Sequence, residues 1–433
     1  MLADYGLRTW EEKAIGDLGR VVTGKTPPKA ESQYWDGDEL FVSPKDLEDG
    51  ELYITTTESR ITERALDKFS NQVLPANSVM FTSLSFGFGK MGITSRPSLT
   101  NQQINSIIVN EKHDYRFVYY LLRSYTPFIF AFNSGIDTPI VPKSVFEKVK
   151  VLCPPLKTQR KIAGILSAYD DLIENNRRRI AILERMAEEV YREWFVRMRF
   201  PGCQDTQFVK GVPEGWRDTR LSAIADVNPE SLGSTTKHET IRYVDIGSVT
   251  TDVINGFEEV SIGDAPGRAK RVVRHGDIIW SSVRPGNRAH AIVLEPPDNL
   301  IVSTGFAVLR HKPAIPVAFL YQTVTTDSFV GYLELVAKGA AYPATAFDDF
   351  ERAPVLLPTE NLLERYDNIV KPMLAQRLHL DNANRRLKAC RELVIGRLIS
   401  GRLPLDDLDV HLPESMSSLE ECLETLPQEL AHA

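Results

Sequence analysis

The sequence predicts an α+β protein with two tandem-repeated globular α/β domains. We expect two long helices to separate the domains and to pair as an antiparallel coiled coil in a pseudo-twofold arrangement. Three observations predict this fold. Segments of the first half recur in the same order in the second half, each copy consists of short β-like runs, and each copy ends in a long stretch with helical spacing. A length of 433 residues also favours more than one core.

Four pairs of segments carry the repeat. The residues that follow Trp10 match those that follow Trp216, and the other matches are 74–93 with 273–292, 101–109 with 303–311, and 134–155 with 338–358. All offsets are close to 200 residues and the order never changes. Identity within each match is low, so the agreement in order and spacing carries the inference of two diverged copies.

Short strands are expected in each copy, because β-branched and aromatic residues stand between turn residues. Examples are ELFVSP (39–44), SVMFTS (78–83) and QINSIIV (103–109). These runs predict the strands of a mixed α/β domain.

Two long helices are expected after these strands. Apolar residues recur at steps of mostly three and four from about Thr158 to Met198, and again from Leu362 to Leu398. A helix of about 40 residues is roughly 60 Å long, which favours packing along a second helix. The alternative is a pair of ordinary amphipathic helices, broken at Gly164 and Pro372.

Composition indicates a globular protein, with 42% hydrophobic and 25% charged residues. No basic stretch followed by an apolar run opens the chain, and the most apolar window is interrupted by Arg123 and Pro127. The four cysteines stand singly, which fits a reducing compartment and gives no C-x-x-C metal motif. We therefore expect a cytoplasmic protein without a metal site.

The net charge of −7 is unevenly distributed. Residues 405–433 hold eight Asp or Glu and no Lys or Arg, and removing them leaves residues 1–404 at +1. We expect the acidic segment to be a flexible, solvated tail. A nearly neutral body with local basic clusters permits DNA binding without requiring it.

A literal G-x-G-x-x-G spans Gly87 to Gly92 and raises the question of a dinucleotide site. Such a fingerprint opens a helix whose N-terminus holds the pyrophosphate. Here β-branched residues and Pro97 follow, and the matching loop of the second copy keeps only Gly286. The pattern indicates a hairpin-like turn.

Residues 153–202 resemble the specificity (S) subunits of type I restriction-modification systems. The resemblance includes EWFVRMRFPG (193–202) and extends to 23–47, to VPEGWRDTRLSAIADV (212–227) and to NRRLKACRELVIGRLISGRL (384–403). At the head of the first helix it rests on Pro155, Gln159, Ile162, Ala163, Ile165, Leu166 and Asp170. The second copy lacks a glutamine that matches Gln159.

The resemblance implies a DNA-reading subunit without catalysis of its own. Each target-recognition domain would read one half of a bipartite site, and the helices would set the spacer. Adenine methyltransferase (M) subunits would supply S-adenosylmethionine, and restriction/motor (R) subunits would supply ATP and Mg²⁺, so no cofactor is expected on this chain. We expect recognition domains at 1–155 and 200–358, spacer helices at 156–199 and 359–404, and the acidic tail at 405–433.

Residues for DNA contact are sought among Lys and Arg for phosphates, and Arg, Lys, Asn and Gln for base edges. The alternative for any single one is a solvated side chain on a turn. In the first copy the candidates are Lys25, Thr26, Lys90, Arg96, Asn101, Gln102 and Gln103. In the second copy they are Arg268, Lys270, Arg271, Arg274, Arg284 and Arg288.

Two other classes of protein stay open at this point. A nucleotide-dependent enzyme would need a motif such as N-P-P-Y or a P-loop, and the sequence contains neither. A coiled-coil adaptor that binds only proteins would use the paired helices, but it would leave the duplicated domains with their basic turn unexplained.

Overall fold

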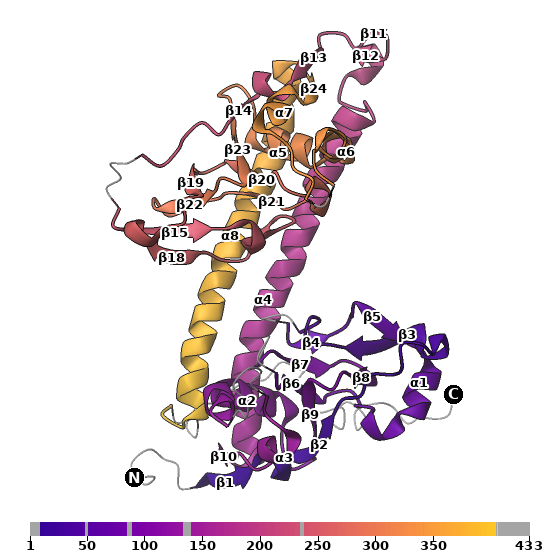
Figure 1. Ribbon diagram of the computed structural model, residues 1–433, viewed down its shortest axis with the longest axis vertical. Coiled ribbons are helices and arrows are strands. Elements are labelled where there is room, and N and C mark those ends of the chain that lie inside the picture. The colour runs from indigo at the N-terminus through magenta and orange to yellow at the C-terminus, as the bar shows by residue number, and fades with distance from the viewer. Residues whose placement is uncertain are drawn as a thin grey trace, which may run out of the picture. The chain divides into compact units, whose positions relative to one another are not determined.

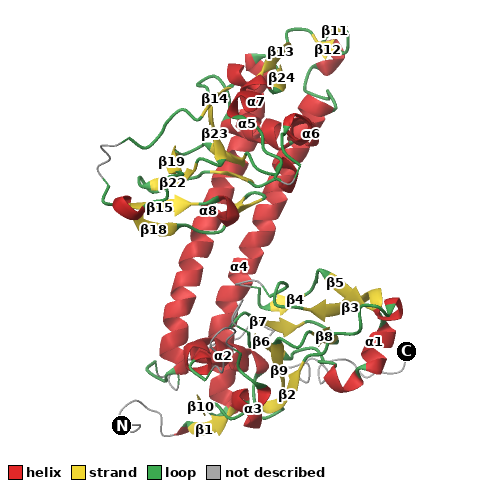
Figure 2. Cartoon of the chain, viewed as in Figure 1, coloured by secondary structure: helices red, strands yellow, loops and turns green. Residues whose placement is uncertain are grey.

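The computed structural model describes residues 9–47, 51–84, 89–132, 140–233, 238–340, 342–403 and 405. The chain forms two compact units. Unit 1 consists of Met1–Arg177 and Asn382–Ala433, and unit 2 consists of Arg178–Asp381. Both contain strands and helices, and each contains a part of both long helices (Figures 1 and 2).

Unit 1 contains a five-stranded sheet of order β2-β9-β6-β7-β4, a three-stranded sheet of order β5-β3-β8, and the pair β1-β10. The strands are β1 (Glu11–Ala14), β2 (Gly19–Thr23), β3 (Trp35–Val42), β4 (Tyr53–Ile54), β5 (Ser59–Ile61), β6 (Val79–Thr82), β7 (Met91–Thr94), β8 (Ser98–Thr100), β9 (Ile104–Val109) and β10 (Lys150–Cys153). The helices are α1 (Glu63–Lys68), α2 (Tyr115–Phe130), α3 (Lys143–Phe146) and the first part of α4 (Leu156–Tyr191).

Unit 2 contains sheets of order β14-β23-β20-β21 and β18-β15-β22-β19, and the pairs β13-β24, β16-β17 and β11-β12. The strands are β11 (Phe208–Val209), β12 (Val212–Pro213), β13 (Arg217–Arg220), β14 (Ala225–Val227), β15 (Thr240–Val244), β16 (Val249–Thr250), β17 (Val253–Ile254), β18 (Glu258–Ser261), β19 (Ala269–Val272), β20 (Ile278–Ser281), β21 (His290–Ile292), β22 (Leu300–Ser303), β23 (Phe306–His311) and β24 (Pro354–Leu357). The helices are α5 (Val317–Thr325), α6 (Asp327–Val336), α7 (Phe347–Arg352) and α8 (Glu360–Ile399), whose end belongs to unit 1.

The internal repeat is confirmed by the strand order of the two units. Strands β2-β9-β6-β7 and β14-β23-β20-β21 occupy equivalent places, and their neighbours are antiparallel in both sheets. In the second sheet of each unit, the pairs β3-β8 and β15-β22 are parallel. Strand β9 begins at Ile104 and β23 at Phe306, so this match lies at an offset of 202 residues. The predicted α+β fold class is therefore correct.

Both long helices belong to the cores of the domains. In unit 1, Ile162 and Leu166 of α4 and Leu398 of α8 are buried in one cluster with Phe81 and Phe117 of the domain. Buried positions spaced three or four residues apart form one apolar face on each helix. The apolar face of each helix therefore packs against the sheet-bearing domain as well as against the other helix.

The helices are antiparallel within unit 1. Asp170 of α4 forms an ion pair with Arg391 of α8. Further along α4, the side-chain amide of Asn176 donates a hydrogen bond to the side-chain oxygen of Asn384 at 2.9 Å. Residue numbers thus rise on one helix while they fall on the other. Asp170 also accepts a hydrogen bond from the hydroxyl of Tyr120 on α2, so a buried polar network joins the domain to both helices.

Unit 2 has the same antiparallel pairing, with aromatic residues at its centre. Tyr191 lies 6.3 Å from Tyr366 of α8 and 5.9 Å from Phe319 of α5, measured between ring centroids. Glu184, which precedes Tyr191 by seven residues on α4, forms an ion pair with Arg377 of α8 at 3.0 Å. These contacts confirm the predicted antiparallel coiled coil in each unit.

The alternative of helices broken at Gly164 and Pro372 is wrong, and the predicted long helices are continuous. Helix α4 continues through Gly164, and α8 continues through Pro372, although proline cannot donate the backbone hydrogen bond of that turn. Phe195 and Phe200 follow α4 and are buried around Trp216, so they pack at the junction between helix and domain.

The two copies use different chemistry at one matching position. Gln159 is buried in unit 1, where it accepts a hydrogen bond from the backbone N–H of Asp114 at 3.0 Å and donates to the carbonyl of Pro154 at 2.8 Å. The first residues of α4 and α8 are 204 positions apart, which matches Gln159 with Leu363. Leu363 is buried beside an apolar pocket that Pro316 also lines. The missing second glutamine is thus replaced by apolar packing.

The buried ion pair of unit 1 predicts a large loss of stability in Asp170→Ala. This substitution leaves the Arg391 guanidinium and the Tyr120 hydroxyl buried without their carboxylate, so we expect the free energy of unfolding to fall by about 3–5 kcal/mol. Asp171→Ala is the matched control, because Asp171 is adjacent but exposed. Urea unfolding followed by circular dichroism measures both variants, and equal losses would contradict the role of the pair.

Candidate nucleic-acid interface

In unit 1, three loops meet at one edge of the five-stranded sheet, where β2 and β6 end and β7 and β9 begin. Backbone hydrogen bonds hold them together: Ser83 donates to the carbonyl of Gln103 at 2.9 Å, and Gly24 donates to that of Ile104 at 3.1 Å. We call residues 24–26, 83–84, 89–90 and 101–103 the loop edge of unit 1. Regular strands therefore position every described residue of this edge.

Six of the seven candidates of the first copy lie on this loop edge. The Thr26 hydroxyl donates to the Gln102 side-chain oxygen at 2.7 Å, and the Asn101 amide donates to that of Gln103 at 3.2 Å. The carbonyl of Lys90 accepts a hydrogen bond from Thr82 at 2.9 Å, which closes the turn between β6 and β7.

The exposed Lys25 extends over the ring of Phe69, with its ammonium 5.5 Å from the ring centroid. Together with Lys90, it places positive charge beside the amides and the hydroxyl of this edge. Side chains of the types that read base edges in protein–DNA complexes thus lie next to cations of the type that binds phosphates.

Arg96 is not part of the loop edge. It precedes β8, whereas Asn101 follows that strand, so the two residues lie at opposite ends of it. The guanidinium of Arg96 pairs with Glu39 at 3.7 Å and donates to the carbonyl of Asp38. Because Asp38 and Glu39 belong to β3, Arg96 links β3 to the segment that leads into β8.

The G-x-G-x-x-G pattern lies on the same turn. Gly87 and Phe88 are outside the described residues, while Gly89 has a left-handed φ of 78° and Gly92 belongs to β7. Strand β7 runs antiparallel to β6, so a strand and not a helix follows the glycines. The expectation of a hairpin-like connection in place of a dinucleotide fingerprint is confirmed for these strands.

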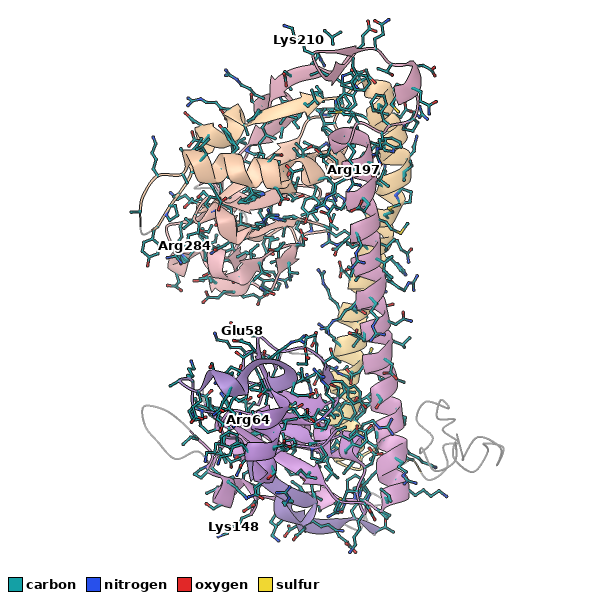
Figure 3. The ribbon with its side chains drawn as sticks, turned by 90° about the vertical axis from the view of Figure 1, so that its right-hand side faces the viewer. Glu58, Arg64, Lys148, Arg197, Lys210 and Arg284 are labelled. Atoms are coloured by element: carbon teal, nitrogen blue, oxygen red, sulfur yellow. The ribbon has the colours of Figure 1, made fainter. Side chains whose placement is uncertain are left out.

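Unit 2 repeats the loop edge with arginines. Ser282 donates to the carbonyl of Gly305 at 2.9 Å, as Ser83 does to Gln103, and Thr304 donates to the carbonyl of Arg268 at 2.7 Å. We call residues 268, 282–289 and 304–305 the loop edge of unit 2. It brings together Arg268, Arg284 and Arg288, and Figure 3 shows the side chain of Arg284 on the surface of this unit.

The other candidates of the second copy lie on strand β19 or shortly after it. Lys270 is exposed on it, while Arg271 packs its guanidinium 5.0 Å from the ring centroid of Phe347, and burial lowers the pKa of that guanidinium. Arg274 lies beyond the far end of the strand and pairs with Glu230 at 2.8 Å. Arg271 and Arg274 are therefore engaged in contacts within the domain.

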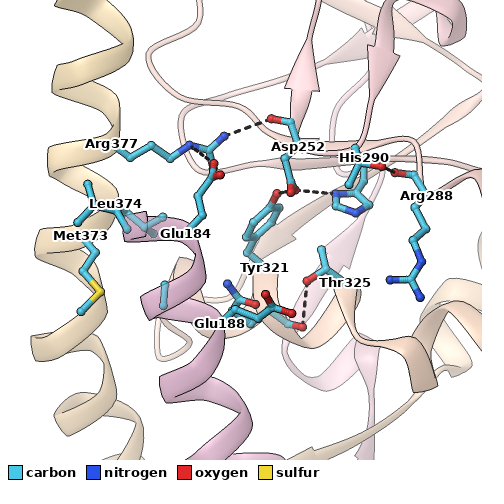
Figure 4. Close-up of a pocket in the computed structure, with 14 residues that line it drawn as sticks. Glu184, Glu188, Asp252, Arg288, His290, Tyr321, Thr325, Met373, Leu374 and Arg377 are labelled. Atoms are coloured by element: carbon cyan, nitrogen blue, oxygen red, sulfur yellow. Dashed lines mark hydrogen bonds and ion pairs between the residues drawn. The ribbon is translucent and has the colours of Figure 1, made fainter. Parts of the chain in front are cut away.

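Arg288 belongs to the loop edge of unit 2 and also lines a pocket of about 180 Å³, which residues of α4 and α8 line as well (Figure 4). The guanidinium of Arg288 pairs with Asp327. Asp252 accepts a hydrogen bond from the Tyr321 hydroxyl, and one of its carboxylate oxygens lies 3.3 Å from the Nδ1 atom of His290.

Arg377 of α8 connects this pocket to the long helices. It donates to the backbone carbonyl of Asp252 at 3.2 Å and pairs with Glu184 of α4 at 3.0 Å. Thr251 in turn donates to the carbonyl of Arg288 at 3.1 Å. A chain of polar contacts therefore leads from both helices to the loop edge of unit 2.

The comparisons with known proteins agree on one family. Residues 8–185 match the family model "Type I restriction modification DNA specificity domain". The MjaIX specificity subunit of Methanocaldococcus jannaschii is 26% identical over 429 residues, which covers 93% of this chain and 95% of the relative. The MjaVIII specificity subunit of the same organism is 24% identical, covering 94% and 96%. Over most of its length the chain is therefore similar to type I restriction-modification specificity subunits.

A solved structure supports the fold of this chain. The S subunit of a type I restriction-modification system from M. genitalium aligns with a TM-score of 0.53 and 17% identity, covering 90% of this chain and 96% of that chain. At this identity the match concerns the fold alone. Separately, none of the helices within the described residues is both long and apolar enough for a membrane span.

One exposed aromatic residue of unit 2 was not predicted from the sequence. Tyr342 is 70% exposed, and the guanidinium carbon of Arg284 lies 4.6 Å from the centroid of its ring. Tyr342 stands 58 positions after Arg284, within a run of small and turn-forming residues, KGAAYPATA (338–346). An exposed aromatic in such a run was the available signal, but only the fold places it against the loop edge.

His290 predicts a pH dependence of the stability of this protein. Burial lowers the pKa of His290 below its ordinary value of 6.5, and Arg288 lowers it further, against the opposite effect of Asp252. The unfolded chain then binds the proton more readily, so the contribution of His290 is complete above about pH 6.5 and is lost as the pH falls below that value.

We expect the free energy of unfolding to fall toward pH 5.5 less steeply in His290→Asn than in wild type, by up to about 1.4 kcal/mol per pH unit. Urea unfolding between pH 5.5 and 8 measures the two slopes. Equal slopes would show that His290 titrates alike in the folded and unfolded chain.

Proposed function

We propose that this chain reads a bipartite DNA site for a type I restriction-modification complex, with one half-site read by the loop edge of each unit. The observation that carries the proposal is the equivalence of the two loop edges. The same hydrogen bond, from Ser83 to Gln103 and from Ser282 to Gly305, joins the same two loops in both units. Both edges present side chains of the types that bind phosphates and base edges.

The two edges differ in chemistry, which supports an asymmetric site. Unit 1 offers amide and hydroxyl groups with two lysines, and Thr26 and Gln102 already bond to each other. Unit 2 offers the arginines Arg268, Arg284 and Arg288. Because Asn and Gln suit adenine and Arg suits guanine, the two edges favour different bases. Lys25 and Lys90, together with Lys270, are assigned to phosphate contacts.

We assign the spacing of the half-sites to the paired helices. Helix α4 has 36 residues and α8 has 40, which corresponds to about 54 Å and 60 Å at ~1.5 Å per residue. One turn of duplex DNA is about 34 Å long, so helices of this length can hold two reading domains apart by a turn of DNA. Their exposed faces would also receive the methyltransferase subunits, with the restriction subunits joining that core.

The chain itself has no catalytic role in this proposal. S-adenosylmethionine would be bound by the methyltransferase subunits, and ATP with Mg²⁺ by the restriction subunits, so that adenine-N6 methylation or cleavage takes place on the partners. The working compartment would be the cytoplasm, where the DNA is. The domain boundaries at 155, 199, 358 and 404 and the acidic tail belong to the same proposal.

A protein-binding adaptor is the second candidate, and the paired helices favour it. The loop edges decide against it, because an adaptor has no need of two matched edges that carry cations beside amide groups.

The experiment is to co-express the chain with its methyltransferase subunit in a host without adenine methylation and to map N6-methyladenine across the genome. The proposal predicts one split motif with a fixed gap. Methylation at a continuous motif would contradict the two half-sites. Absence of methylation from a soluble, assembled complex would favour the adaptor.

Lengthening both α4 and α8 by one helical turn should change the spacer and leave both half-sites unchanged. One turn adds about 5.4 Å, which corresponds to roughly one to two base pairs. The same insertion in α4 alone is the control: it puts the helices out of register, so methylation should be lost. Motif mapping measures both, and a change in the bases read would contradict the assignment of spacing to the helices.

A further inference from the structure

Two arginines of the unit 2 loop edge adopt an uncommon backbone conformation. Arg284 and Arg288 flank a single 3-10 turn, Pro285–Asn287, and both have left-handed φ values, 49° and 52°. This region is unfavourable for residues with a long side chain, so it persists only where the surrounding structure imposes it.

The surrounding structure imposes this conformation. Arg284 donates its backbone N–H to the carbonyl of Pro343 at 2.7 Å, and Thr345 donates to the carbonyl of Ser282 at 2.9 Å. A side chain at Gly286 would meet a carboxylate oxygen of Glu334 at 2.3 Å, so the turn also lies close against α6. The loop is therefore held on two sides, by the segment 343–345 and by α6.

The side chain of Arg284 is oriented as well. Its guanidinium carbon lies 4.6 Å from the ring centroid of Tyr342, and both residues are exposed. Stacking on a ring uses the face of the guanidinium, whereas its N–H groups donate in the plane. The stacking on Tyr342 thus orients the plane of the Arg284 guanidinium at the surface.

Other arginines near this edge have different surroundings. Arg288 pairs with Asp327, Arg274 pairs with Glu230, and Arg271 packs against Phe347. Arg284 is the one of these four that an exposed aromatic ring supports at the protein surface.

We propose that Arg284, oriented by Tyr342, is a specificity-determining residue that reads a guanine in the half-site of unit 2. The inference rests on the proposed function. In the major groove guanine presents the acceptors O6 and N7, which match two donors of the guanidinium fork. A phosphate contact needs only charge and tolerates a mobile side chain, whereas reading a base edge requires the fixed orientation that Tyr342 and the strained turn provide.

The test compares the methylated motifs of complexes that contain wild-type chain, Arg284→Ala or Arg284→Lys. We expect wild type to require guanine at one position of one half-site. Both variants should accept other bases there, with discrimination reduced on the order of 10- to 100-fold. The other half-site and the spacer should not change. Because lysine keeps the charge but lacks the fork, Arg284→Lys should lose the discrimination while retaining more overall methylation than Arg284→Ala.

Two further variants test the role of the ring, and one is a control. Tyr342→Phe keeps the stacking surface and should retain the wild-type motif, whereas Tyr342→Leu should relax the same guanine position as Arg284→Ala. Arg217→Ala removes an equally exposed arginine from β13, away from the loop edge, and should leave the motif unchanged.

The possible results separate this inference from the proposed function. A split wild-type motif that stays unchanged in both Arg284 variants would overturn the guanine contact alone. Uniform weakening at all sites, without a change in base preference, would assign Arg284 to a phosphate and also overturn it. A wild-type complex that methylates no split motif would overturn the proposed function, and the inference with it.

Discussion

The structure depends on the pairing of α4 with α8 inside each domain core. In each unit a sheet must bury its apolar face, and buried residues of both α4 and α8 pack against that face. Unit 1 fixes the pairing with the buried ion pair of Asp170 and Arg391, and unit 2 with the aromatic residues around Tyr191 and Tyr366. At the offset of 204 residues, Asp170 corresponds to Leu374 and Arg391 to Ala187. The ion pair thus has no charged counterpart in unit 2.

This pairing links recognition to the helices through short chains of contacts. In unit 2 the chain runs from Glu184 through Arg377 to Asp252, and from the neighbouring Thr251 to the loop of Arg288. In unit 1 the hydroxyl of Tyr120 connects α2 to the Asp170–Arg391 pair. A loop held in this way keeps a defined position relative to the helices of its own unit. Base recognition needs such a rigid support, because a displaced donor no longer matches the base edge.

Periodicity and the repeat were sufficient to predict the fold class, the antiparallel helices and the places of the matching strands. They also placed Lys90 and Arg284 on equivalent turns, since the offset between β6 and β20 follows from the repeat. The direction of the strands and the tertiary contacts, which the sequence pattern does not give, determine which of the other candidates lie together. Arg96 and Asn101 are close in sequence but lie at opposite ends of β8, and Tyr342 reaches Arg284 only through tertiary contacts. Charge and residue type alone did not show which arginines, such as Arg274, pair with a carboxylate within the domain.

The central claim is that each unit reads its own half-site independently, on a common pair of helices. Exchange of residues 217–357, from β13 to β24, for the matching segment of a related specificity subunit with a different known motif tests it most directly. Mapping of N6-methyladenine in the complex with the chimera should show one new half-site, with the other half-site and the spacer retained. A change in both half-sites, or in neither, would contradict the claim.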